Sequence, residues 1–172
     1  MRVPHKLRSE TELYEAALRA LARRAHSVYE MKQALERRAE DKGMVRPVLE
    51  RLKCAGLLDD ARYARQFARQ RSEIRRQGKF RIARDLRGRG VPDRHIEAAL
   101  EETSRQTDEA AVVRQRIERK LKLLRGEIDE RKIASLYRSL LRAGFSTDII
   151  RRELRAMTRE EVPEISEASD NL

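Results

Sequence analysis

Apolar residues recur along this chain at the three- and four-residue spacing that is typical of amphipathic helices. The pattern begins with Leu13 and Leu21 and continues, broken at glycines, as far as Leu154. Ser27 and Glu30 form an S-x-x-E capping box, which predicts that a second helix starts there. The spacing between the breaks is helical throughout, so we expect an all-α fold.

An internal repeat organises the predicted helices. Each unit has a long helix, a shorter helix, a glycine-containing turn and a third helix, and residues 1–59 follow this plan more loosely, with an insertion at 41–43. We therefore expect three tandem three-helix repeats that form an elongated, curved array. The expected bounds are a flexible N-terminus at 1–9, repeats at 10–58, 59–104 and 105–157, and an acidic disordered tail at 158–172. Two repeats match at a constant offset of 54 residues through Ile82, Leu86, Gly90, Val91, Ile96 and Leu100 against Leu136, Leu140, Gly144, Phe145, Ile150 and Leu154.

Charge is concentrated in the middle of the chain. The 172 residues carry a net charge of +11, and residues 60–94 alone contribute twelve basic and four acidic side chains. Residues 158–172 reverse the sign, with one basic and five acidic side chains. A basic segment favours a polyanionic partner, for which nucleic acid is the first candidate. Uniform codon bias toward arginine would not concentrate the charge in one segment.

The chain lacks the residue patterns of an enzyme. It has no glycine-rich phosphate loop, and its histidines, His5, His26 and His95, are scattered rather than placed at metal-ligand spacing. We therefore expect no catalytic residue, no metal and no cofactor. Cys54 cannot form a disulfide within the chain and is interpreted as a small core residue. The absence of a long apolar stretch predicts a cytoplasmic protein with no membrane span.

A row of arginines is the strongest candidate for a binding surface. On a helix predicted over 60–77, four arginines fall within roughly 60° of arc, opposite a buried seam of Tyr63, Phe67 and Ile74. They are Arg62, Arg65, Arg69 and Arg76. Such a row suits phosphates or the carboxylates of an acidic partner, although a solvated helix face is the alternative interpretation. The predicted contact residues are Arg62, Arg65, Arg69, Arg76, Lys79, Arg81 and Arg84.

A helix-turn-helix interpretation of the middle repeat is disfavoured. The helix in the recognition position, 93–102, carries four carboxylates against a single arginine, Arg94. The DNA backbone would repel these carboxylates, so sequence-specific reading of the major groove is not expected there.

Several ordered motifs resemble the RecX family of regulatory proteins. The run Gly56-Leu57-Leu58-Asp59-Asp60-Ala61-Arg62-Tyr63-Ala64 resembles the family's G-[LY]-[LI]-[DN]-D-x-x-[YF]-[AV] motif, and Ser27-Val28-Tyr29-Glu30-Met31 resembles its S-x-x-E-[LM] motif. The segment from Gly78 to Leu86, followed by Arg89-Gly90-Val91, resembles its G-x-x-[RK]-I-x-x-[ED]-L-x-x-[KR]-G-[IV] segment. Together the motifs cover roughly residues 13–157, and their order and spacing make the resemblance specific.

The resemblance implies a function without catalysis. Proteins similar to RecX are tandem three-helix repeats that bind the RecA recombinase and its nucleoprotein filament, in the groove or at the end, and lower its ATPase, strand-exchange and co-protease activities. By this resemblance the chain is a monomeric RecA modulator in recombination, DNA repair and the SOS response, with weaker electrostatic contact to DNA phosphates. A general DNA- or RNA-binding protein that acts without RecA is the alternative, and a purely structural helical adaptor is a third possibility.

Overall fold

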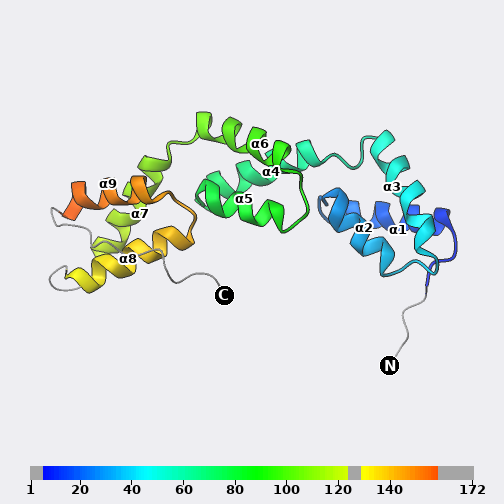
Figure 1. Cartoon of the computed structure of the whole chain (residues 1–172), viewed down its shortest axis with the longest axis horizontal. Coiled ribbons are helices and arrows are strands. Elements are labelled where there is room, and N and C mark those ends of the chain that lie inside the picture. The colour runs from blue at the N-terminus through cyan, green and yellow to red at the C-terminus, as the bar shows by residue number, and fades with distance from the viewer. Residues whose placement is uncertain (1–5, 124–128, 159–172) are drawn as a thin grey trace, which may run out of the picture. The chain divides into compact units, whose positions relative to one another are not determined.

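The computed structural model describes residues 6–123 and 129–158, which form helices joined by short connections (Figure 1). Within these ranges there is no strand, and the β pairing is an isolated bridge between Leu7 and Ala39. None of the described helices is long and apolar enough to cross a membrane. The predicted all-α fold is confirmed. The elements are α1 (Glu10–Arg23), α2 (Val28–Glu36), the 3-10 turn η1 (Lys42–Met44), α3 (Val45–Cys54), α4 (Asp60–Glu73), α5 (Lys79–Arg87), α6 (Asp93–Gln106), α7 (Glu109–Leu123), α8 (Glu130–Arg142) and α9 (Thr147–Thr158).

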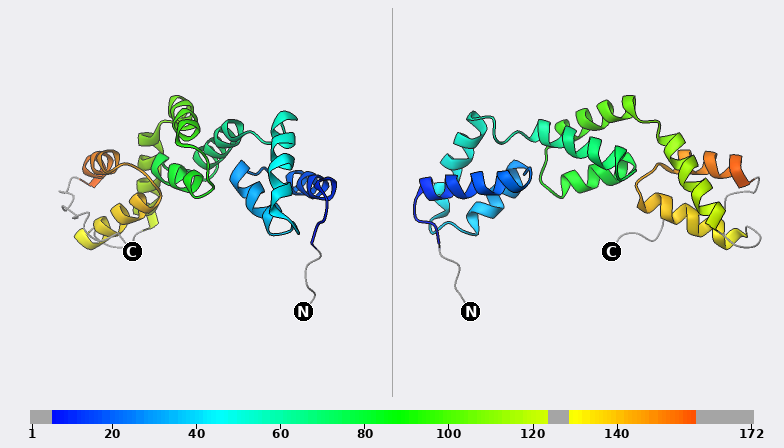
Figure 2. Two further views of the ribbon diagram at one scale, coloured as in Figure 1. Left: turned by 45° about the vertical axis from the view of Figure 1, so that its right-hand side comes forward. Right: turned by 180° about the vertical axis from the view of Figure 1, so that it is seen from behind.

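The chain divides into two compact units. Unit 1 comprises Met1–Arg69 and Ala83–Glu102, and unit 2 comprises Gln70–Ile82 and Thr103–Leu172. In unit 1, α1, α2 and α3 pack against one another, and in unit 2, α9 packs against both α7 and α8 (Figure 2). Removing these aliphatic faces from water is the main source of stability for each group of helices. The two cores include Leu13, Met31, Leu35 and Leu52 in unit 1, and Val113, Ile117, Tyr137, Leu140, Ile150 and Leu154 in unit 2.

Polar side chains start several helices at the positions that the sequence indicates. Ser27 and Glu30 form the predicted capping box, with the Ser27 hydroxyl accepting the Glu30 backbone N–H at 3.1 Å. The Ser9 hydroxyl and the Asp129 carboxylate cap α1 and α8 in the same way. Each cap satisfies a backbone donor that the first helical turn leaves without a partner. Leu7, within the segment expected to be flexible, is buried beside Ala39.

Three glycines end helices in the left-handed conformation. Each places its own φ at a positive value, and the next residue's N–H donates to a carbonyl five residues earlier, which is the Schellman arrangement. Two of these glycines are 54 residues apart, so the structure reproduces the sequence repeat at atomic detail. The glycines are Gly56 (φ 66°), Gly90 (φ 69°) and Gly144 (φ 89°), and the bonds run from Leu57 to Leu52 (2.9 Å), from Val91 to Leu86 (3.2 Å) and from Phe145 to Leu140 (3.3 Å).

The end of α4 differs from the prediction. The helix stops at Glu73 rather than continuing to 77, and Arg76 adopts a left-handed φ of 52°. Ile74, predicted to lie in the buried seam, is 72% exposed because it follows the last helical residue, whereas Tyr63 and Phe67 are buried as predicted. Tertiary hydrogen bonds from unit 2 hold the segment after the helix: Arg116 donates to the Arg75 carbonyl at 3.2 Å.

Cys54 is also placed differently from its prediction as a core residue. It is exposed in the last turn of α3. At about 100° per residue, it lies roughly 200° from Leu52, which is fully buried on the core face. The apolar character of the surrounding sequence therefore did not reveal which face of α3 Cys54 occupies.

Replacing Gly90 and Gly56 by alanine separates backbone strain from close packing. Both glycines have nearly the same φ, but a Cβ on Gly90 would lie 2.4 Å from the Tyr29 Cβ, whereas a Cβ on Gly56 meets nothing within 4 Å. We expect Gly56→Ala to lower the free energy of unfolding by about 1 kcal/mol. Gly90→Ala should cost at least about 2 kcal/mol more, because Tyr29 must also move. Urea denaturation of both variants measures the difference, and equal losses would contradict the proposed close contact.

Candidate recognition surfaces

Two junctions between successive repeats each contain a hydrogen bond to a carbonyl at the same position of the repeat. In unit 1 the Ser27 hydroxyl donates to the carbonyl of Arg89 at 2.6 Å, and in unit 2 the backbone N–H of Gly78 donates to the carbonyl of Ala143 at 2.9 Å. Ser27 and Gly78 each directly precede the second helix of a repeat. Arg89 and Ala143 each precede the turn glycine of the next repeat, and they are 54 residues apart. The junction is therefore repeated along with the helices.

A carboxylate holds the unit 1 junction together. Glu30 accepts hydrogen bonds from Arg24 at 3.0 Å, from the Tyr63 hydroxyl at 3.2 Å and from Arg89 at 2.5 Å. The Arg89 guanidinium also lies 5.1 Å from the ring centroid of Phe67. Residues from α2, α4 and the turn before α6 thus meet at one charged group. The junction residues carry much of the family resemblance. They are Ser27, Glu30, Tyr63, Arg89 and Gly90.

The contacts at the unit 1 junction shift the pKa values of Glu30 and Tyr63. Burial opposes the charged form of Glu30, but hydrogen bonds from Arg24 and the Ser27 N–H, together with the charges of Arg24 and Arg89, leave its pKa below the ordinary value. Burial, followed by the negative charge of Glu30, raises the pKa of Tyr63. Glu30 is therefore a structural anion at neutral pH.

The first part of the predicted arginine row lies on α4 in unit 1. Arg62, Arg65 and Arg69 are exposed, on the side opposite the buried Tyr63 and Phe67. Arg62 also donates to the carbonyl of Gly56 at 2.6 Å, which fixes its guanidinium near the end of α3. Arg65 makes no hydrogen bond or ion pair with the part of the chain that the structure describes. The outward orientation predicted for these three arginines is confirmed.

The remaining predicted contact residues divide between the units. Arg84 is exposed on α5 in unit 1, while Arg76, Lys79 and Arg81 belong to unit 2. Arg76 is outside α4 and donates to the Gln115 side chain at 2.9 Å, so the prediction of one helical row reaching Arg76 is wrong. Arg81 is half-buried and donates to the carbonyl of Arg142 at 3.1 Å.

Unit 2 contains a groove that the sequence did not reveal, and we call it the cationic groove. It encloses about 370 Å³ between the segment after α4, the middle of α7 and α8. None of the described residues that line it is acidic. Arg75, Arg76, Arg116, Arg119 and Lys120 supply its positive charge, and Ile74, Leu136 and Leu140 supply apolar surface.

Arg116 lies at the centre of the charge in this groove. It is half-buried, its guanidinium lies 5.6 Å from the ring centroid of Phe145, and it donates to the Arg75 carbonyl. Burial, followed by the positive charges of Arg119 and Arg76, lowers the pKa of Arg116. An anion in this groove would relieve the repulsion between the guanidinium groups.

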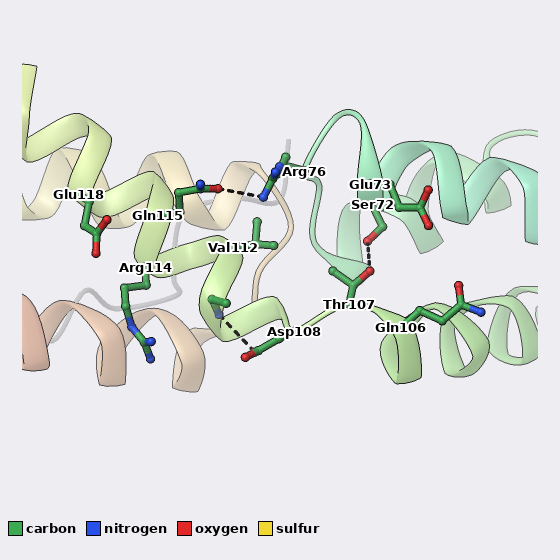
Figure 3. Close-up of a pocket in the computed structure, with 11 residues that line it drawn as sticks. Ser72, Glu73, Arg76, Gln106, Thr107, Asp108, Val112, Arg114, Gln115 and Glu118 are labelled. Carbon is green, nitrogen blue, oxygen red and sulfur yellow. Dashed lines mark hydrogen bonds between the residues drawn. The ribbon is translucent and has the colours of Figure 1, made fainter.

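A larger pocket nearby is lined by side chains of both charges. It encloses about 610 Å³ within unit 2, and its lining combines acids such as Glu73 and Glu118 with Arg76 and Arg114 (Figure 3). Figure 3 shows Arg76 turned toward Gln115. Opposite charges lining one open pocket do not favour a polyanion, so this pocket is a weaker candidate than the cationic groove. Among the described residues, no group of three or more His, Cys, Asp or Glu is placed to hold a metal ion.

The fold and these surfaces define an all-helical repeat protein with exposed cationic surfaces. A family model described as the first three-helix domain of RecX matches residues 14–52, and one described as the second three-helix domain matches residues 59–100. The chain belongs to the RecX family. Its helical repeats are those expected from the family description.

Relatives along most of the chain support this assignment. A regulatory protein RecX from Halorhodospira halophila is 44% identical over 137 residues, covering 80% of this chain and 83% of the relative. One from Prosthecochloris aestuarii is 34% identical over 149 residues, covering 85% and 95%. The crystal structure of RecX from Lactobacillus salivarius has the same fold, with a TM-score of 0.76 and 22% identity over 88% of this chain and 97% of that one.

Replacing Glu30 by glutamine tests the junction. The change leaves Arg24 and Arg89 without their carboxylate, so the free energy of unfolding should fall by about 2 kcal/mol at neutral pH. Because the pKa of folded Glu30 is lowered, its stabilisation is present above the unfolded-state pKa and is lost as the pH falls below about 4. The difference between the wild-type chain and Glu30→Gln should therefore shrink in acid.

Glu50→Gln is the matched control for this substitution. Glu50 is exposed and paired with Lys53 at 3.0 Å on α3. Because exposed pairs stabilise little, this variant should stay within about 0.5 kcal/mol of the wild type at every pH. Chemical denaturation at a series of pH values measures both variants. Equal effects of the two substitutions would contradict a structural role for Glu30.

Proposed function

We propose that this chain regulates RecA by binding the recombinase and its nucleoprotein filament without performing chemistry of its own. Membership in the RecX family, whose relatives are named regulatory proteins, supports this proposal. The exposed arginines of α4 and α5 support it physically, because arginine forms paired hydrogen bonds with both phosphates and carboxylates. A filament of protein on DNA offers both kinds of anion. The expected effect is a lower RecA ATPase, strand-exchange and co-protease activity.

The proposed contact surface has its firmest support on α4. Arg65 and the neighbouring arginines Arg62 and Arg69 share one exposed face, while the opposite face is buried in the fold. Charge on a rigid helix loses little conformational freedom on binding, which favours affinity. Lys79, Arg81 and Arg76 of unit 2 remain proposed contacts. The side chains of Arg76 and Arg81 donate hydrogen bonds within the protein, which reduces what they can offer to a partner. The hydrogen bond of Lys79 is made by its backbone N–H and leaves the ammonium group exposed.

A nucleic-acid-binding protein that acts without RecA is the second candidate. The exposed arginines favour it equally, because phosphates alone would satisfy them. Gel shifts with single-stranded DNA, with and without RecA, distinguish the two candidates. Binding that is the same in both cases, with log affinity falling linearly against log salt, would favour the second candidate.

Reversing one charge on α4 tests the RecA proposal. Arg65→Glu should raise by about tenfold the concentration of this protein that halves the DNA-dependent ATPase of RecA, since a favourable contact becomes a repulsive one. Arg46→Glu, an equally large charge change at an exposed site on α3 of the same unit, should stay within about twofold of wild type. An ATPase that the wild-type chain leaves unchanged at every ratio would refute the inhibitory role.

A further inference from the structure

Where the structure describes it, the lining of the cationic groove of unit 2 contains no negative charge to neutralise the basic side chains. Five basic residues line it without an acidic one, and Arg116 sits half-buried among Arg119 and Arg76. Its surface also includes apolar side chains, among them the 72% exposed Ile74. Its best ligand therefore combines carboxylates or phosphates with aliphatic groups. The described part of the lining includes no aromatic side chain on which a nucleic-acid base could stack.

The chain itself contains a segment of that chemistry. Residues 159–172 follow the last described helix and carry five acidic side chains and one basic one. Glu160, Glu161 and Glu164 alternate with the aliphatic residues Val162 and Ile165. This mixture of charge and aliphatic groups matches the two kinds of surface in the groove.

The segment also begins close enough to reach the groove. α9 ends at Thr158 and packs along α7, and Met157 packs against the core that α7 and α8 share. Fourteen extended residues span up to about 46 Å, several times the roughly 10 Å diameter of a helix. The segment can therefore pass around α7 to the side of the helix that lines the groove.

We propose that residues 159–172 dock in the cationic groove of their own chain, with the glutamates against Arg116, Arg119 and Lys120. This docking is independent of the function proposed above, because its test contains neither RecA nor DNA.

A nitroxide label on the tail tests the docking in the full-length chain. Ser166→Cys in a Cys54→Ser background gives one attachment site, since Cys54 is the chain's single cysteine and is exposed. We expect the amide signals of residues 115–120 and 136–140 to lose most of their NMR intensity at low salt. They should recover in 1 M NaCl, where the Debye length is about 3 Å.

Charge variants identify the groove as the site. Arg119→Glu should abolish the loss of intensity, whereas Arg138→Glu should preserve it, because Arg138 is exposed on α8 but does not line the groove. Replacing Glu160, Glu161 and Glu164 by glutamine changes no residue of the described helices. This variant should also abolish the loss of NMR intensity.

Three results would overturn the proposal. The first is no intensity loss at low salt, and the second is loss confined to the arginines of α4. The third is an equal loss in a mixture of spin-labelled chains without isotope and isotope-enriched chains without the spin label, because the tail would then occupy a second copy.

Discussion

The carboxylate of Glu30 is the interaction on which the first repeat junction depends. It lies at the start of α2 and accepts from Arg24, from the Tyr63 hydroxyl and from Arg89, so that one anion joins three segments of unit 1. A charge in a partly buried position is costly unless every neighbour satisfies it, and here the neighbours do. The Ser27 hydroxyl adds a hydrogen bond to the Arg89 carbonyl, which fixes the backbone at the same place.

This junction divides the basic residues by role. Arg89 has the charge of a binding residue, yet it is half-buried against Glu30 and the ring of Phe67. Arg87 is likewise paired, at 2.7 Å from Asp93. Arg84 on the same helix as Arg87, and Arg65 on α4, are exposed and have no such partner among the described residues. Net charge in a sequence therefore overstates the cationic surface that a partner can reach.

The division also explains why family motifs and contact residues need not coincide. Ser27, Glu30 and Gly90 resemble the family pattern because the junction requires a hydroxyl, a carboxylate and a residue without a Cβ at those positions. The positions of the proposed contact arginines are less constrained, since any exposed cation on the same face attracts an anion. The cationic groove was missed because Arg75 and Arg116 are 41 residues apart in sequence and meet only through tertiary structure.

The sequence by itself determined the helices, the capping box that starts α2 and the 54-residue repeat, because helical periodicity, capping side chains and turn glycines act over a few residues. It also indicated the exposed face of α4 through Arg65 and its neighbours. Only the tertiary structure decided that α4 ends at Glu73, that Ile74 and Cys54 are exposed, and that Arg89 turns inward. These outcomes depend on hydrogen bonds and packing with residues distant in the chain, which local patterns do not encode.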